Sequence, residues 1–382
     1  MKILYLLFKI GPYHHTRFKY IAKQYDLTVV EVFPTSREYD WNDIDTEGIY
    51  KVVRLNNEEE NELKGRKLLE NINKLICAIS PDVVVTMGWS IKTYFAALKV
   101  AKSYNIPVCC LSDSTKDDYR RYWIIENLKS SFVKSFDSFL VAGKRSKQYL
   151  NNLGIKEGIF TPMDVVDNDF FANPRGIVKE DLPSPYLLCV SRMIEEKNLF
   201  SLIESFANFK KKNQSNLKLM IIGSGPLENK IKEFIYSLNI SDIVIKEFIQ
   251  NNLLPDLYAN AKALILPSIK DTWGLVVNEA MASGIPVIVS DRCGCCDDLV
   301  INEVNGWVIK PTIDGIYNAL IMLSGSSEGK LKEMGNMSRK IISKFSLNDF
   351  NIGFVSMIDY AINNNKKLNF IQKLLISLRI YF

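Results

Sequence analysis

Short runs rich in β-branched residues alternate with stretches of helical periodicity along the whole chain. Such alternation is typical of parallel sheets built from strand–helix units. Between the two halves, the stretch NDFFANPRGIVKEDLPSP carries proline and charge with little periodicity. The pattern therefore predicts an α/β protein with two separate parallel sheets. The expected strands are KILYLLF, LTVVEVF, YKVVRL, DVVVTM, IPVCCL, SFLVA and GIFTP, then YLLCVS, LKLMII, DIVIKEF, ALILP, IPVIVS and GWVI.

The same pattern sets the expected domain organisation. We predict an N-terminal domain over 1–172, a linker over 173–184, a second domain over 185–345 and a C-terminal helical segment over 346–382. Two apolar stripes at helical spacing predict helices that pack on the sheets. They are Leu199, Leu202, Ile203, Phe206 and Phe209, and, after the first strand, Phe18, Ile21, Ala22 and Tyr25.

Composition restricts the class of protein. The 382 residues are 47% hydrophobic and 24% charged, which is typical of a globular protein with a substantial core. A net charge of +5 is too small to indicate nucleic-acid binding, although an anionic small molecule or surface fits it. The N-terminal MKILYLLFKI reads as a first strand and not as a signal peptide. No run reaches the roughly 18 apolar residues of a membrane span, so we expect a cytoplasmic protein.

The C-terminal segment from 368 to 382 has a helical apolar face and two cations elsewhere, Lys373 and Arg379. This pattern fits a short helix at a membrane surface. A terminal helix that packs back on the N-terminal domain fits it equally well. The residues of the apolar face are Ile371, Leu374, Leu375, Leu378 and Phe382.

The seven cysteines include the pair Cys109 and Cys110 and the cluster CGCC, with Cys293, Cys295 and Cys296. A zinc site would need paired C-x-x-C spacing or nearby histidines, and neither occurs. We expect reduced structural thiols and no metal.

Ligands of open α/β sheets gather at the carboxyl ends of the strands, so with two domains the predicted site is the cleft between them. In VSRMIEEKN, Arg192 and Lys197 follow a predicted strand. A guanidinium fork and a mobile ammonium together suit a diphosphate. The alternative is that both are solvated loop charges beside Glu195 and Glu196.

The stretch IIGSGPLENK ends a second predicted strand with Gly223 and Gly225, and Pro226 suits the first position of a helix. A dinucleotide fingerprint would need a third glycine where Glu228 stands, which argues against a nicotinamide dehydrogenase. By itself this turn is more often a tight connection than a ligand cradle.

The stretch DTWGLVVNEAMASGIPVIVSD predicts a helix that begins near Gly274 and runs through Ser283. The positive end of such a helix suits pyrophosphate. Asp271 could accept hydrogen bonds from sugar hydroxyls, and Glu279 could accept both hydroxyls of a ribose. The alternatives are a helix-capping acid for Asp271 and an exposed polar face for Glu279.

These motifs occur in an order that resembles the donor-binding half of the family 4 glycosyltransferases. The order is VSR…KN, IIGSGPLE, YANAKALILPS, DTWGLVVNEAMASGIPVIVSD and NGWVIKP, over roughly 185–345. DSFLVAGKRSKQYLNNLGI and GPYHHTRFKYIAKQYDL are similar to the N-terminal half of the family. The resemblance implies a retaining enzyme of the GT-B fold, with two Rossmann-like, doubly wound domains facing a cleft and a C-terminal helix crossing back.

The resemblance also implies roles for single residues. Arg192 and Lys197 match the pair that holds the donor diphosphate. Asp271 matches the acid that contacts the donor sugar, and Glu279 matches the acid that contacts the ribose. The donor site would further include Gly223, Gly225, Trp273, Gly274 and Leu275, with no metal and no cofactor apart from the donor substrate.

Two departures from the family stand out. Position 271 is aspartate where most members carry glutamate, which shortens its reach. The histidine that many members have after the fifth strand is replaced by LSDST, so Asp113, His14 and His15 are the candidate catalytic groups of the first half. His14 shares a helical face with Phe18 and Ile21, and it could equally be a packed residue. Gly11 would let the backbone approach the donor.

The function expected is transfer of a sugar from a UDP- or GDP-sugar to a saccharide or lipid-linked saccharide, in surface polysaccharide synthesis such as capsule or O-antigen. The protein would work in the cytoplasm or on the cytoplasmic face of the membrane, without nucleic acid. The alternatives are a nucleotide-sugar epimerase or hydrolase of the same fold, and a non-catalytic module that binds nucleotides or glycans.

Overall fold

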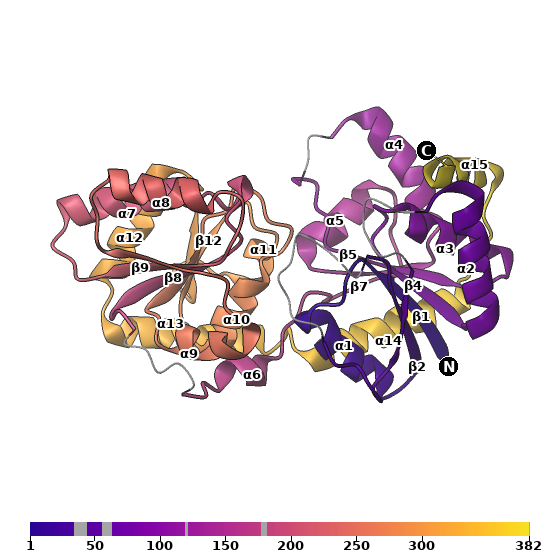
Figure 1. The fold of residues 1–382 in the computed structure, drawn as a ribbon, viewed down its shortest axis with the longest axis horizontal. Coiled ribbons are helices and arrows are strands. Elements are labelled where there is room, and N and C mark those ends of the chain that lie inside the picture. The colour runs from indigo at the N-terminus through magenta and orange to yellow at the C-terminus, as the bar shows by residue number, and fades with distance from the viewer. Residues whose placement is uncertain (34–43, 56–62, 119–120, 177–181, 382) are drawn as a thin grey trace. The chain divides into compact units, whose positions relative to one another are not determined.

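The computed structural model describes residues 1–33, 44–55, 63–118, 121–176 and 182–381. The chain forms two compact units, each built around its own sheet (Figure 1). The first unit comprises Met1–Asp164 and Leu347–Phe382, and the second comprises Val165–Ser346.

The first unit contains a seven-stranded sheet in the order β3-β2-β1-β4-β5-β6-β7. Every pair of neighbouring strands is parallel. All seven predicted strands of this half are present. They are β1 (Lys2–Leu7), β2 (Asp26–Glu31), β3 (Lys51–Arg54), β4 (Val83–Met87), β5 (Val108–Ser112), β6 (Ser138–Val141) and β7 (Ile159–Phe160).

Helices cover both faces of this sheet. On one face lie α2 (Gly65–Ile79), α3 (Lys92–Ser103), α4 (Trp123–Val133), α5 (Lys144–Asn152) and the last helix, α15 (Phe370–Tyr381). On the other face α1 (Pro12–Ala22) packs beside α14 (Leu347–Asn363). The predicted stripe in α1 is confirmed for Phe18 and Ile21, which are buried, whereas Tyr25 lies beyond the end of the helix.

The second unit contains a six-stranded parallel sheet in the order β10-β9-β8-β11-β12-β13. The six strands predicted for this half are all present. They are β8 (Tyr186–Val190), β9 (Lys218–Ile222), β10 (Ile243–Lys246), β11 (Ala263–Leu266), β12 (Val287–Ser290) and β13 (Gly306–Ile309).

Two layers of helices enclose the second sheet (Figure 1). One layer contains α7 (Leu199–Lys212), α8 (Glu228–Ser237) and α12 (Ile313–Gly325), and the five predicted residues of the α7 stripe are buried. The other layer contains α6 (Asn168–Ala172), α9 (Leu254–Ala259), α10 (Leu275–Ser283) and α13 (Glu328–Ile342). The short elements are η2 (Glu195–Lys197), η3 (Asn251–Leu253) and α11 (Cys296–Leu299).

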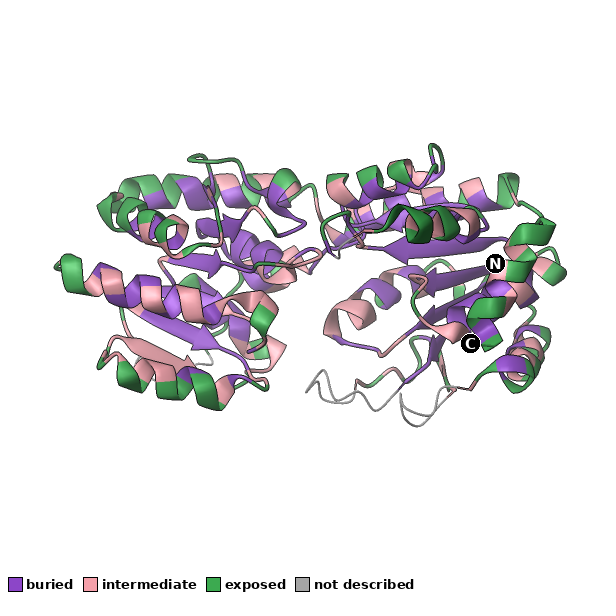
Figure 2. Ribbon diagram, turned by 90° about the horizontal axis from the view of Figure 1, so that it is seen from above, coloured by how far each residue is buried: buried purple, intermediate pink, exposed green. Residues whose placement is uncertain are grey.

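Both sheets are doubly wound. The chain enters each at a central strand, β1 or β8, builds outward to one edge, and then crosses to build the other side from β4 or β11. Strands buried on both faces explain the apolar runs of the sequence. Figure 2 shows the central strands of both units buried beneath partly exposed helices, whereas the edge strands β3, β7 and β10 are less buried. The reversal of strand order opens a crevice at the carboxyl ends of the central strands, where ligands of such sheets bind.

The boundary between the units lies earlier than the sequence predicts. The predicted N-terminal domain ends at residue 172, but Val165 onward belongs to the second unit. The reason is the packing of α6, because Phe171 is buried with its ring 6.0 Å from that of Tyr258 and its carbonyl accepts a hydrogen bond from Ser283. Part of the predicted linker, residues 177–181, lies outside the described residues.

The C-terminal helices belong to the first unit. A buried ion pair anchors the segment between α14 and α15, because Lys102 Nζ lies 2.5 Å from Asp137 and the same carboxylate accepts the amide of Lys366 at 2.8 Å. Lys102 also donates to Asn365. None of the helices in the described parts of the chain has both the length and the apolar character that crossing a bilayer demands.

We predict that Asp137→Ala destabilises the first unit by about 3–5 kcal/mol, because it leaves a buried ammonium without its partner. Hydrogen exchange of the β5 and β6 amides measures the loss. The control is Asp26→Ala, which removes an ion pair with Lys51 whose side chains are 71% and 47% exposed and should cost less than about 1 kcal/mol. Equal losses in the two variants would contradict the prediction.

Candidate functional site

The loop after β8 exposes Arg192 at the surface. Hydrogen bonds from the loop after β9 hold this β8 loop in place. Met193 donates its amide to the carbonyl of Ser224 at 2.7 Å and accepts the amide of Leu227 at 3.1 Å. The two loops approach so closely that position 223 must be glycine, because a Cβ on Gly223 would lie 1.9 Å from the carbonyl oxygen of Ser191. The turn with Gly223 and Gly225 is therefore a tight connection, and contact of these glycines with a ligand stays a prediction.

Lys197, at the end of η2, pairs with Asp271. Its Nζ lies 2.5 Å from Oδ2 of Asp271, and the two side chains are only 16% and 12% exposed. The alternative of a solvated loop charge is therefore wrong for Lys197, whereas Arg192 is exposed. Two residues 74 positions apart meet because β8 and β11 are neighbours whose carboxyl ends lie at the same edge of the sheet.

Asn198 fixes this arrangement, although its role was not predicted from the sequence. It adopts a left-handed conformation with φ of 58° between η2 and α7, and its side-chain amide donates to the carbonyls of Pro267 at 3.1 Å and Pro311 at 3.0 Å. The carbonyl of Glu196 accepts the amide of Ile269 at 2.9 Å. Three loops that follow different strands are thus tied together. The sequence feature that could have indicated this role is the asparagine directly after Lys197.

The helix α10 begins where the sequence predicts, at Leu275, and continues through Ser283. Gly274 precedes it with φ of +97°, and a Cβ there would lie 2.7 Å from the side chain of Leu266, so glycine is needed on both counts. The N-cap residue is Gly274, which has no side chain, and the Asp271 carboxylate accepts a hydrogen bond from Lys197, so the structure does not support the capping alternative for Asp271. The amides of the first turn give this end a partial positive charge.

Glu279 and Trp273 both point into the protein. Glu279 is fully buried, so the alternative of an exposed polar face is wrong, and its carboxylate accepts a hydrogen bond from the hydroxyl of Tyr258 at 2.6 Å. Trp273 is 3% exposed and donates from Nε1 to Asn278 at 2.9 Å. The tryptophan therefore supports α10 from within, and its contact with a donor stays a prediction.

The cluster CGCC supports the Asp271 loop from the other side. Gly294 donates its amide to the carbonyl of Asp271 at 2.9 Å, and Cys295 donates to that of Trp273 at 3.1 Å. Burial, together with the charge of Asp271, raises the pKa of Cys293 well above its usual range, so this thiol remains neutral. All three clustered cysteines are buried and lie outside any disulfide.

A metal site was not expected. Within the ranges that the structure describes, no three His, Cys, Asp or Glu side chains gather in an arrangement that could hold a metal ion. The absence of a metal requirement stays a prediction.

The candidates of the first unit follow β1 and β5 at the carboxyl edge of its sheet. Gly11 directly precedes α1, and His14 and His15 lie in its first turn. Asp113 follows β5, and its carbonyl accepts a hydrogen bond from Ser146 at 2.9 Å. Because β4 separates β1 from β5, Asp113 and the histidines approach this edge from different strands.

His14 is a packed residue with a defined tautomer. Its Nδ1 accepts the amide of Gly11 at 3.2 Å, so the proton of the neutral ring resides on Nε2, and the ring stacks on Phe18 with centroids 6.4 Å apart. Burial and the charge of Arg17 lower the pKa of His14 to about 3. At neutral pH this residue can donate a hydrogen bond from Nε2 but carries no charge.

His15 lies beside Tyr50. Its Nδ1 lies 2.9 Å from the hydroxyl of Tyr50. Burial, and then the charge of Lys19, lower its pKa. The two histidines are therefore both neutral at physiological pH.

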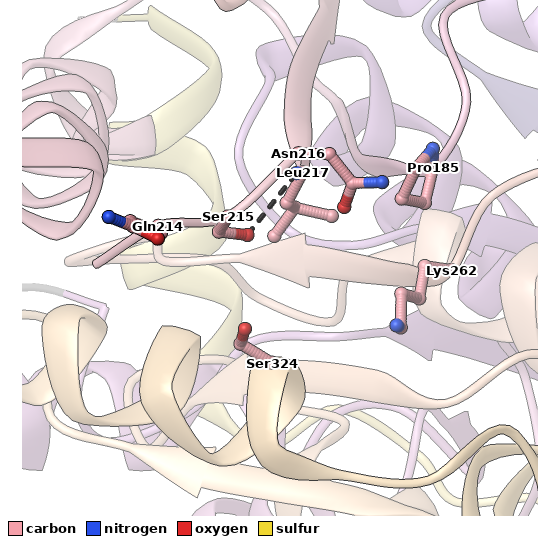
Figure 3. A pocket seen from close by; sticks show the side chains of 7 residues that line it. All are labelled: Pro185, Gln214, Ser215, Asn216, Leu217, Lys262 and Ser324. Atoms are coloured by element: carbon pink, nitrogen blue, oxygen red, sulfur yellow. Dashed lines mark hydrogen bonds between the residues drawn. The ribbon is translucent and has the colours of Figure 1, made fainter.

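A pocket of about 340 Å³ in the second unit lies away from these residues (Figure 3). Its lining includes Pro185, Leu217 and Lys262, which directly precede β8, β9 and β11. The pocket thus lies at the amino ends of the strands, opposite the edge that carries Arg192 and Asp271. Since ligands of such sheets bind at the carboxyl ends, this pocket is not the predicted site.

Residues 172–341 match the family described as "Glycosyl transferases group 1". An uncharacterized glycosyltransferase of Methanocaldococcus jannaschii is 33% identical over 34% of this chain and 33% of its own length. An alpha-monoglucosyldiacylglycerol synthase of Acholeplasma laidlawii is 26% identical over 71% of this chain and 74% of its own length. Other similar proteins are a capsular polysaccharide biosynthesis glycosyltransferase of Staphylococcus aureus and an O-antigen chain mannosyltransferase of Salmonella typhimurium, each 26% identical, over 58% and 53% of this chain and over 57% and 62% of their own lengths, respectively. The chain spans one third to just over half of the length of several of these relatives.

The fold has counterparts among solved structures. HepE of Anabaena, crystallised with UDP, superposes with a TM-score of 0.74 at 16% identity, over 94% of this chain and 100% of that protein. At this identity the likeness concerns the fold alone. It confirms the GT-B fold expected from the sequence motifs.

We predict that Lys197 and Asp271 are energetically coupled. Lys197→Met alone destabilises the second unit because it leaves the shielded carboxylate unpaired. The double variant with Asp271→Asn should lose less stability than the two single variants added together, and the difference should be about 0.5–3 kcal/mol. Urea unfolding followed by hydrogen exchange of the β8 and β11 amides measures the cycle. The control pair is Lys262 and Glu328, of which Glu328 is 85% exposed, and it should show weaker coupling. Strictly additive effects at 197 and 271 would contradict the prediction.

We also predict that His14 makes stability fall with acid. Its pKa is about 3 in the folded protein and about 6.5 when unfolded, so between these values the unfolded chain binds the extra proton. Above pH 6.5 the ring is neutral in both states and does not lower the free energy of unfolding. Below pH 6.5 the free energy of unfolding falls by up to about 1.4 kcal/mol per pH unit because of this residue. His14→Asn keeps an acceptor for the Gly11 amide but does not titrate. Urea unfolding of both proteins from pH 7.5 to 4.5 should give diverging curves, and parallel curves would refute the assignment.

Proposed function

We propose that this chain, whose second unit belongs to the glycosyl transferases group 1 family, transfers a sugar from a nucleoside diphosphate to an acceptor with retention of configuration. The donor is a UDP- or GDP-sugar, and the acceptor is a saccharide or a lipid-linked saccharide. Relatives named for capsule, O-antigen and glycolipid synthesis support an acceptor that belongs to a surface glycan or glycolipid.

The pairing of Lys197 with Asp271 beside the positive end of α10 is the observation that carries this proposal. A cation, a carboxylate and a helix end meet at the carboxyl edge of the second sheet, and Arg192 lies on the exposed part of the adjoining loop. Nucleoside diphosphate sugars carry two negative phosphates and several hydroxyls. The arrangement offers cations for the phosphates and carboxylate oxygens for the hydroxyls.

Charge development explains how this arrangement would accelerate transfer. Breaking the bond between the sugar carbon and the diphosphate oxygen leaves negative charge on the departing diphosphate. Arg192, Lys197 and the helix end would oppose that charge more strongly in the transition state than in the ground state. Groups already held in place need no reorganisation during the reaction, and the clamp of Asn198 supplies such rigidity for Lys197.

Lys197 would have a second effect, through Asp271. A bare carboxylate next to a diphosphate would repel it, and at 2.5 Å the ammonium offsets this repulsion. Asp271 can then accept hydrogen bonds from the donor sugar. Glu279 is proposed to contact the ribose, with Tyr258 fixing one oxygen of its carboxylate.

The first unit would bind the acceptor. His14, His15 and Asp113 lie at the carboxyl edge of its sheet, where Gly11 would let the backbone approach the donor. A neutral His14 suits hydrogen-bond donation better than proton abstraction. We propose that no metal takes part and that the protein works in the cytoplasm or at the cytoplasmic face of the membrane.

We predict that Arg192→Ala and Lys197→Ala each lower the rate of nucleoside diphosphate release by roughly 10²–10³-fold, because each removes charge stabilisation from the leaving group. Glu279→Gln should raise the apparent dissociation constant for the nucleotide more than it lowers the rate. Product release from UDP- and GDP-sugars, followed by mass spectrometry with and without saccharide acceptors, measures both.

The matched control is Lys332→Ala, which removes an exposed lysine of α13 in the same unit and should leave the rate unchanged. Normal release from Arg192→Ala and Lys197→Ala would overturn the site assignment. Release of free sugar in place of a glycosylated product, with every acceptor tried, would overturn the proposed transfer.

A further inference from the structure

Two helices of the first unit expose large apolar side chains. On α4, Trp123 is 75% exposed, and on α15, Phe370 is 80% exposed. Their neighbours along each helix are similarly exposed, and they are Ile124, Ile125 and Leu128 on α4 and Ile371, Leu374 and Leu378 on α15. Contiguous apolar surface of this kind is uncommon on a monomeric protein and marks an interaction site.

The two helices lie side by side (Figure 1). The side-chain amide of Gln372 on α15 donates to the carbonyl of Ser131 on α4 at 3.3 Å. Ile376 and Ile380 are fully buried in the core of the unit, and Lys99 of α3 donates to Ser377 at 2.8 Å. Of the two alternatives for this helix, packing on the N-terminal domain is therefore what the structure shows. The predicted apolar stripe nevertheless stays exposed for three of its residues, and Phe382 lies outside the described part of the chain.

The segment that carries α15 is basic as well as apolar. Residues 364–381 contain four cations and no acidic residue. On α4 the acid Glu126 lies 2.7 Å from Lys129 and accepts the hydroxyl of Tyr149 at 2.8 Å. Although burial acts in the opposite direction, these hydrogen bonds lower the pKa of Glu126, so its charge is compensated locally. The four cations are Lys366, Lys367, Lys373 and Arg379.

A pocket of about 420 Å³ adjoins both helices. Three of its lining residues are cations, Arg121, Lys129 and Arg379, and two apolar residues of the exposed α4 stripe, Ile125 and Leu128, contribute to its wall. Trp89 and Ser114, which follow β4 and β5, line it as well. The pocket thus connects the apolar face with the carboxyl edge of the sheet, where the acceptor would bind.

We propose that the face formed by α4 and α15 docks on an anionic phospholipid bilayer, with a lipid phosphate entering the pocket of Arg121, Lys129 and Arg379. This deepens the proposed function, on which it rests, because it assigns the acceptor to a membrane surface. Exposed Trp and Phe side chains suit the boundary between head groups and acyl chains. Long basic side chains beside them can extend to the lipid phosphates. An acidic protein partner would match the charge but would leave the large apolar side chains without a hydrocarbon phase.

Flotation of the full chain with vesicles tests the docking. We expect binding to vesicles of phosphatidylcholine and phosphatidylglycerol in equal parts, and at least tenfold weaker binding to phosphatidylcholine alone. The double variant Trp123→Ser with Ile124→Ser, and Leu374→Ser separately, should each weaken binding to the anionic vesicles at least tenfold. The control is Tyr236→Ser, which removes an exposed aromatic side chain, 88% accessible, from α8 of the second unit and should bind like the unmodified protein.

Two further variants separate the parts of the proposal. Arg379→Gln should reduce the preference for anionic over neutral vesicles without abolishing binding. Trp123→Phe should bind normally but lose most of the fluorescence quenching by brominated acyl chains, which also verifies docking without a loss-of-function variant. Equal binding to both vesicle types, or unchanged binding by both apolar variants, would overturn the proposal.

The experiment also distinguishes other occupants of the face. If the protein forms dimers in solution, does not bind vesicles and becomes monomeric in the Trp123 and Ile124 double variant, then a second copy covers the face. Failure of docking with normal sugar transfer to a soluble acceptor would refute this inference and leave the proposed function intact. Normal docking without any sugar transfer would refute the proposed function and leave the docking inference intact.

Discussion

The ion pair between Lys197 and Asp271 is the interaction on which the candidate site depends. It joins loops that follow two different strands, and it places an ammonium, a carboxylate and the start of α10 together. Asn198 and the amides of Gly294 and Cys295 hold the same loops by hydrogen bonds to their carbonyls. Because the hydrogen bonds of Asn198, Gly294 and Cys295 end on backbone carbonyls, they hold the loops in place before any ligand binds. Rigid groups stabilise charge in a transition state without the free-energy cost of reorganisation.

A second ion pair has the corresponding structural role in the first unit. Lys102 and Asp137 are almost completely buried, and through Asn365 and Lys366 they hold the chain where it passes from α14 to α15. This anchor fixes α15 against α3 with one apolar face buried and another exposed. A helix that is apolar on two sides needs two partners, and the described part of the first unit supplies only one of them. The proposed membrane face follows from that imbalance.

Much of the fold could be predicted because its signals are local. Each strand appears as a short β-branched run, and α10 begins beside a glycine that the left-handed backbone requires. The side-chain environment was harder to predict. The alternatives for the two acids were an exposed polar face for Glu279 and a helix cap for Asp271, yet Glu279 is fully buried against Tyr258 and Asp271 is paired with a lysine 74 residues away. Likewise, α6 was assigned to the wrong unit because its partners, α9 and α10, lie far along the chain.

The sequence by itself determined the order of strands and helices, the two parallel sheets and the residues that follow the strand ends, since periodicity and turn residues act over a few positions. The tertiary structure alone decided which of those residues meet. It paired Lys197 with Asp271, gave Asn198 its clamp, neutralised His14 by burial and set α4 beside α15. Such contacts depend on the strand order of a sheet and on the packing of helices distant in sequence. No local pattern contains that information, because the free energy of each contact arises from groups that become neighbours only on folding.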